Sequence, residues 1–198
     1  LEDLNLQNND FNDQDVTDLS NSLVNNCVLR RLDLIYNNEV TAAGWRVFSA
    51  VLQNQNSALE IIDLSFNSIN DEALDSFAHS LVGNNKLKEL YLDPDEDNEE
   101  NGIHITNWEP LSNVLCNKSS IGATFNSNHT LQRVFEDDEE ANESGLPSEL
   151  RHFLQLNTEN TKIESARRKI LKVHFSGKFS MQPFIDMDLK TLPHAIAW

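Results

Sequence analysis

The sequence predicts an α/β solenoid built from stacked strand–helix repeats. A nine-residue pattern, LxxLxLxxN, occurs three times and begins a fourth time, with starts at Leu1, Leu29, Leu59 and Leu87. These starts lie 28, 30 and 28 residues apart, a period typical of units that each contain one strand and one helix. Because a single unit cannot bury its own apolar positions, neighbouring units must stack and complete a continuous core.

Each pattern is expected to form a short strand of a parallel sheet. The leucines of one strand, for example Leu4 and Leu6, should point into the core that the next unit completes. The closing asparagines, Asn9, Asn37 and Asn67, should turn the chain off the strand. Their side-chain amides can bond the backbone groups that such a turn leaves open.

A helix is expected after each strand. Asp13, Thr41 and Asp71 are capping residue types that stand where these helices should begin. Apolar residues then recur at helical spacing, which predicts one buried face per helix. These residues are Val16, Leu19 and Leu23, then Trp45, Phe48, Val51 and Leu52, then Leu74, Phe77, Ala78 and Leu81.

The second half of the chain departs from the regular period. The fourth unit lacks the closing Asn, and an insertion at about 93–107 delays the next leucine pattern to Leu131. An acidic loop, 136–145, follows this degenerate fifth strand, and apolar spacing then predicts two further helices. We divide the chain into repeats over 1–162, with units starting near 1, 29, 59, 87 and 131, and a helical C-terminal cap over 163–198 that covers the last unit.

The repeat length and the DxxVxxLxxxL helix resemble the ribonuclease-inhibitor-like subclass of leucine-rich repeats. The resemblance covers residues 1 to about 92. It implies a right-handed horseshoe with a parallel inner sheet and outer helices. The blocks LCNKSSI at 115–121, SNHTL at 127–131, RKILKVHF at 168–175, PFIDMD at 183–188 and LPHAIAW at 192–198 resemble the C-terminal part of uncharacterised diatom leucine-rich-repeat proteins. That resemblance implies no activity and no catalytic residues.

Charge and composition exclude several partners and compartments. Residues 1–150 hold 28 acidic and 7 basic side chains, whereas 151–198 hold 4 and 8, for a net charge of −17. Nucleic acid would require a basic face, and an anionic membrane surface would repel the acidic repeats, so neither is expected as a partner. The sequence contains no run of 18 apolar residues, so no membrane span is predicted. Cys27 and Cys116 are expected to be buried thiols in a reducing, cytoplasmic compartment. Because the chain starts at a repeat leucine, we interpret it as a fragment.

No catalytic, cofactor-binding or metal-binding residues are predicted. Asp93, Asp95 and Asp97 resemble the start of a calcium loop, but Asn98 and His104 stand where Gly and Glu are required. A solvated acidic loop is therefore expected there. A basic cluster, Arg167, Arg168, Lys169 and Lys172, is expected to be a solvated helix face; the alternatives are contact with a phosphate, with an acidic partner or with the acidic loops of the protein itself.

The outward positions of the strands form rows across the sheet. The second row, Glu2, Arg30, Glu60 and Lys88, alternates in sign and should stabilise the sheet. The fifth row reads Asn5, Asp33, Asp63 and Tyr91, and it places two acids on adjacent strands without a base. Like charges placed opposite each other destabilise a sheet, so the pair suggests a contact site. The predicted partner-binding residues of the concave face are Asp33, Asp63, Tyr91, Ile35, Arg31 and Glu89.

The alternative for this face is diagonal neutralisation of the acids by Arg31. The expected function is a monomeric, non-catalytic scaffold that binds a protein with a basic surface on its concave sheet. Two alternatives stay open. The chain could be the ligand-sensing part of a larger signalling or immune-type receptor, or a GTPase-activating scaffold.

Overall fold

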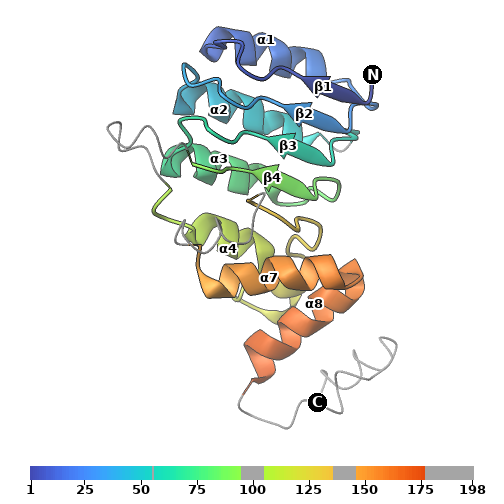
Figure 1. Ribbon diagram of the computed structural model, residues 1–198. Helices are drawn as coiled ribbons and strands as arrows, with labels where there is room; N and C mark the ends of the chain where they lie inside the picture. Colours follow the sequence, from blue (N-terminus) through green and yellow to red (C-terminus); the bar gives the residue numbers. More distant parts are fainter. Residues whose placement is uncertain (55, 95–104, 136–145, 177–198) are drawn as a thin grey trace.

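A computed structural model describes residues 1–54, 56–94, 105–135 and 146–176. The protein is mixed α/β, with a parallel sheet of four short strands in the order β1-β2-β3-β4 (Figure 1). The strands are β1 (Asp3–Asn5), β2 (Arg31–Asp33), β3 (Ile61–Asp63) and β4 (Glu89–Tyr91). Leu4 is opposite Leu32, Leu32 is opposite Ile62 and Ile62 is opposite Leu90. The predicted parallel strands and their register are therefore confirmed.

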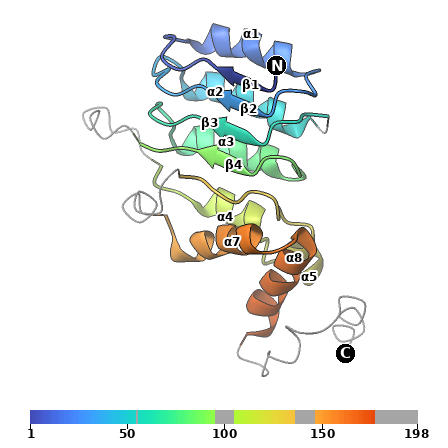
Figure 2. The same cartoon turned by 45° about the vertical axis from the view of Figure 1, so that its right-hand side comes forward.

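The helices form a second layer on one side of this sheet. They are α1 (Asp13–Leu23), α2 (Ala42–Ser49), which continues as a 3₁₀ turn η1 (Ala50–Gln53), α3 (Asp71–Leu81) and α4 (Glu109–Leu115). Figures 1 and 2 show α1, α2 and α3 stacked in the same order as the strands. Each strand and its following helix thus make one layer of the stack.

The core lies between the sheet and the helices. Leu32, Leu34 and Ile62 from the sheet are fully buried. The ring of Trp45 meets those of Phe48 and Phe77 at centroid distances of 6.0 and 6.4 Å. These separations suit edge-on aromatic packing, so the aromatic residues of α2 are core residues, as the helical spacing predicts.

The closing asparagines join successive units. Asn37 donates from Nδ2 to the carbonyl oxygens of Leu34 (2.8 Å) and Leu6 (3.2 Å). Its Oδ1 accepts from the backbone of Asn9 at 3.1 Å. Asn67 repeats this arrangement one unit further, with bonds to Leu34 and Leu64. The predicted role of these amides in the turn is confirmed for both buried residues.

The helix starts differ from the prediction by one residue. Asn12 and Asn70 are the N-caps of α1 and α3, whereas Thr41 caps α2 as predicted. Asp13 is instead the first helical residue and accepts from the backbone N–H and hydroxyl of Thr41, both at 2.7 Å. Asp71 likewise accepts from the backbone and hydroxyl of Thr106, at 2.7 and 2.6 Å. These carboxylates bridge to the next unit, which a cap assigned from sequence alone does not reveal.

The turn after each strand explains why the fourth unit changes. Asn8, Tyr36 and Phe66 occupy the same place in the first three units, and each has a positive φ of 55 to 58°. The corresponding residue of the fourth unit is Pro94. The ring of proline holds φ near −65°, so this turn cannot form there.

The stack continues beyond β4 in a weaker form. Arg133 makes an isolated parallel bridge with Glu89, which confirms the register of the degenerate fifth strand. The described residues beyond this point include the helices α5 (Ile121–Phe125), α7 (Ser148–Glu159) and α8 (Lys162–Ile170), the last continued by a π turn η3 (Leu171–Phe175). Most of the predicted insertion, the acidic loop 136–145 and residues 177–198 of the predicted cap lie outside the described residues.

Candidate partner-binding face

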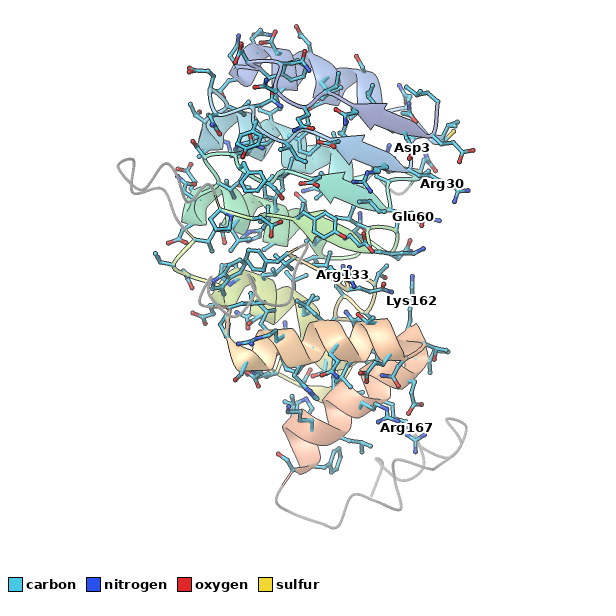
Figure 3. The ribbon with its side chains drawn as sticks, viewed as in Figure 1. Asp3, Arg30, Glu60, Arg133, Lys162 and Arg167 are labelled. Atoms are coloured by element: carbon cyan, nitrogen blue, oxygen red, sulfur yellow. The ribbon has the colours of Figure 1, made fainter. Side chains whose placement is uncertain are left out.

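A ladder of opposite charges crosses the sheet at the residue that precedes each strand. Arg30 lies 3.5 Å from Glu2 and 3.4 Å from Glu60, and Lys88 lies 2.6 Å from Glu60. Figure 3 labels Arg30 and Glu60 at this end of the strands. The hydrogen bond from Lys88 lowers the pKa of the Glu60 carboxyl. The predicted alternating row is confirmed, and its exposed pairs contribute little to the free energy of unfolding.

Asp33 and Asp63 lie side by side, as predicted, but they are not exposed. Only 7% of Asp33 and 4% of Asp63 is accessible. Each carboxylate folds back onto the strand end and accepts from the backbone N–H two residues on, Ile35 at 3.1 Å and Ser65 at 3.0 Å. This Asx-type turn is a local preference of Asp and Asn. It corrects the expectation that the fifth row projects freely from the concave face.

No cation neutralises this pair among the described residues. Asp33 accepts a hydrogen bond from the Asn5 amide at 3.2 Å, but no ion pair forms with Asp33 or Asp63. Arg31 is exposed and makes no ion pair in the described part of the chain, so the diagonal neutralisation left open above is absent there.

A third carboxylate, Asp93, lies two residues beyond Tyr91, which is the partner of Asp63 in the sheet. The hydroxyl of Ser65 donates to Asp93 Oδ2 at 2.8 Å. Burial raises the pKa of the Asp63 carboxyl, and the charges of Asp33 and Asp93 add to that rise. The negative charge at position 63 is therefore energetically unfavourable in the folded protein.

Tyr91 is also less available than predicted. It is buried, and its hydroxyl donates to Glu89 Oε2 at 2.7 Å. Burial raises the pKa of the Tyr91 phenol, and its hydrogen bond with Glu89 acts in the same direction. Because Tyr91 and Glu89 already satisfy each other, Tyr91 is not the free aromatic anchor that we expected. Ile35 is half-buried two residues beyond Asp33.

Two aromatic residues that the sequence analysis did not single out lie beyond the strand ends. The rings of Tyr36 and Phe66 stack at a centroid distance of 4.7 Å and an interplanar angle of 14°. Tyr36 remains 40% exposed. The signal was available in the sequence, because both residues stand seven positions after the first leucine of their units.

The predicted basic cluster is only partly a solvated face, because Lys172 is exposed and Arg168 is half-buried whereas Arg167 and Lys169 are buried. Lys169 is fully buried, and its Nζ donates to the carbonyl oxygens of Leu115 at 2.8 Å and Asn128 at 3.2 Å. Burial lowers the pKa of Lys169 to about 7. Leu115 is the last residue of α4, so the ammonium caps the negative end of that helix. Arg167 is also buried; its Nη1 lies 3.8 Å from Glu164, and its Nε and Nη2 have no hydrogen-bond partner among the described residues.

The two cysteines differ in environment. Cys116 is buried, as predicted, and burial raises the pKa of its thiol. Cys27 is exposed, which corrects the expectation for that residue. It lies in the surface turn between α1 and β2, next to the exposed Val28.

Other kinds of site are poorly supported in the described part of the chain. No group of three or more His, Cys, Asp or Glu side chains there could hold a metal ion. Asp95 and Asp97 of the calcium-like stretch lie outside that part. An open groove of about 610 Å³ lies between residues 132–135 and α7, and its lining includes Arg133, Phe135 and His152. None of the described helices is both long and apolar enough to cross a bilayer.

Comparison with known proteins gives the fold but not a family. No protein-family model and no curated protein matches this chain. Among solved structures, the chain is similar to Leiomodin-1 Actin-Binding Site 2 (ABS2), with a TM-score of 0.55 and 16% sequence identity. The match covers 79% of this chain and 80% of that chain. At this identity the likeness shows the shared fold alone.

Proposed function

We propose that this protein is a leucine-rich-repeat solenoid of the ribonuclease-inhibitor-like type that binds a protein partner on its concave sheet face and catalyses no reaction. The period of the pattern, the parallel register and the Asn37 and Asn67 turn bonds support the repeat assignment. The partner surface is basic, since residues 1–150 hold 28 acidic and 7 basic side chains.

The observation that carries this proposal is an excess charge at positions 33 and 63. In the first unit Asn5 stands in the same row, and its Oδ1 accepts from the backbone N–H of Gln7 at 2.9 Å. This is the bond that Asp33 and Asp63 make in their own units. A neutral amide therefore forms the turn equally well, and the turn gives no reason for two buried carboxylates. A cationic partner surface would supply the missing counter-charge.

The similar solved structure supports protein binding as the general class of function. That segment of leiomodin-1 is an actin-binding site, which makes actin a defined first partner to test. The basic surface required of the partner comes from the charges of this chain and is independent of that name.

The experiment is affinity capture with the purified chain and with an Asp33→Asn/Asp63→Asn variant. Asparagine keeps the turn bond, as Asn5 shows, and removes the charge together with the one bond that Asp33 Oδ2 accepts from the Asn5 amide. We expect a partner that wild type retains and the variant loses, with capture weakened by added salt. Actin co-sedimentation with the same two proteins tests the named candidate directly.

An Arg30→Gln variant is the matched control, because it changes an exposed charge at the start of β2, whereas Asp33 lies at the end of that strand. It should leave capture unchanged. Equal capture by wild type and the Asp33→Asn/Asp63→Asn variant, with both folded by circular dichroism, would refute the assignment of this face.

A further inference from the structure

The stacked pair Tyr36 and Phe66 is not a requirement of the fold. Both residues hold a left-handed backbone, with φ of 55° and 58°. Bulky side chains rarely adopt this conformation, whereas Asn adopts it more readily. The first unit uses Asn8 at this place, also with φ of 55°. The turn therefore forms with a small polar residue. An aromatic residue at this place in each of two successive units makes the left-handed backbone less favourable.

The pair also leaves aromatic surface in solvent. The parallel stack, at 4.7 Å and 14°, joins the two rings to each other. Tyr36 stays 40% exposed and Phe66 is half-buried, while neither belongs to the hydrophobic core. Large aromatic side chains presented in this way are common contact residues of protein interfaces.

The aromatic pair follows the acidic strand ends in the next turn of the chain. The ladder of backbone bonds runs on past the strands, with Tyr36 N–H donating to Ser65 O at 3.3 Å and Phe66 N–H donating to Asp93 O at 2.8 Å. Ser65 in turn bonds both Asp63 and Asp93. The two aromatic residues thus lie in the turn one residue beyond Ser65 and Asp93 in the ladder, and three residues beyond Asp33 and Asp63 along their own chain segments.

We propose that the Tyr36–Phe66 pair is the seat for an arginine side chain of a basic protein segment, with the charge of Asp33 and Asp63 attracting the guanidinium. This inference rests on the proposed function and specifies the chemistry of its partner. A guanidinium is planar, stacks on aromatic faces and is weakly hydrated. A lysine ammonium is a compact, strongly hydrated charge, so it gains less from the same surface.

The test uses two synthetic peptides of equal length and charge, one carrying arginines and the other lysines, and measures binding by fluorescence anisotropy. We expect wild type to bind the arginine peptide about fivefold or more tightly than the lysine peptide. The Tyr36→Asn/Phe66→Asn variant should lose this preference. It should remain folded, because Asn8 already occupies the same turn. Phe125→Asn, which removes a different exposed aromatic ring, is the matched control and should retain the preference.

The outcomes separate this inference from the proposed function. Equal binding of both peptides, unchanged by Tyr36→Asn/Phe66→Asn but weakened by Asp33→Asn/Asp63→Asn, overturns the arginine seat and leaves the acidic face as the binding site. Failure of wild type to bind either peptide also overturns the seat, and the capture experiment then decides the proposed function separately. Loss of the arginine preference in the aromatic variant alone supports the seat.

Discussion

The amide of Asn37 shows how much of this fold depends on single side chains. It donates to the backbone of Leu34 and Leu6 and accepts from the backbone of Asn9 and Phe11. All of these bonds form inside or beside the buried core, where an unsatisfied backbone group costs far more than it does in water. The repeat Asn is therefore a structural residue, and its contribution to stability is measurable.

We expect Asn37→Ala to lower the free energy of unfolding by about 2–3 kcal/mol, because it leaves buried carbonyl and N–H groups without partners. Urea denaturation followed by circular dichroism measures this change. Asn9→Ala is the control and should cost much less, since Asn9 is exposed and its amide bonds only Gln7 O of its own unit. Similar losses in the two variants would show that the amide bonds between units contribute little.

Lys169 makes stability depend on pH in an unusual direction. Its pKa is lowered to about 7 in the folded protein, chiefly by burial, whereas an unfolded lysine titrates near its ordinary value of 10.5. Between these values the unfolded chain binds a proton that the folded chain does not, so stability rises with pH. The penalty of burying the ammonium is fully present below pH 7 and is relieved as the pH increases. The pKa of the neighbouring His129, lowered to about 4 by burial, keeps that ring neutral in this range.

From pH 7 to 8.5 we expect this group to raise the free energy of unfolding by about 1–2 kcal/mol. Lys169→Met should remove that rise, whatever it does to stability at one pH through the lost bonds to Leu115 and Asn128. Denaturant titrations at several pH values give the slope of the free energy of unfolding against pH for wild type and for Lys169→Met. A Lys169→Met protein with the same slope as wild type would show that another group titrates.

At the scale of the element, α2 depends on a close approach to the preceding helix. A Cβ on Gly44 would meet Asp13 Oδ1 and would lie 2.8 Å from Val40 Cγ1. Asp13 is the residue that accepts both bonds from Thr41, the N-cap of α2. The absence of a side chain at position 44 thus allows the bridge between the first two units.

Gly44→Ala should therefore destabilise the protein, although alanine is normally the better helix former by about 1 kcal/mol. The clash forces Asp13 or α2 to shift, and such overpacking costs about 1–3 kcal/mol. Thermal unfolding of this variant measures the net effect. Ala43→Gly, on the exposed side of the same helix, should show only the ordinary loss of helix propensity. A more stable Gly44→Ala protein would mean that Asp13 moves away freely.

The elements that the sequence predicts best are those that its periodicity determines. The strand register, the buried faces of α2 and α3 and the alternating row of Glu2, Arg30, Glu60 and Lys88 all follow from spacing within a repeat. The pattern does not predict how a polar side chain is used once it is placed. Asp33 and Asp63 face the expected way, but a local bond to their own backbone buries them.

Other features depend on contacts between distant segments and are therefore invisible to a repeat pattern. Lys169 reaches the end of α4 from more than fifty residues away. The sequence shows that Tyr36 and Phe66 stand at the same position of successive repeats, but the stacking of their rings is evident only in the structure. Most of the candidate site therefore needed the structure, whereas the parallel sheet did not.

At the scale of the whole molecule, the stack is buried unequally along its length. Leu32 in β2 and Leu34 just after it are fully buried, whereas Leu4 in β1 and Leu6 just after it are only partly buried. The first strand pairs on one side alone, because β1 is the edge of the sheet. In a linear array of this kind, stability is close to a sum of unit and interface contributions.

This arrangement predicts that a further unit of the same pattern stabilises the molecule. Placing a copy of residues 29–58 directly before Leu1 should set a new strand beside β1 and bury Leu4 and Leu6 as Leu32 and Leu34 are buried. We expect the midpoint of thermal unfolding to rise by about 4 °C or more, because each kilocalorie per mole shifts it by about 2–4 °C in a domain of this size. The denaturant m-value should also increase, since one cooperative transition exposes more surface. A matched copy carrying Asn at its Leu32 and Leu34 positions cannot supply the apolar contact and should give no such rise. A separate second unfolding transition from the added segment would show instead that β1 does not accept a further strand at its free edge.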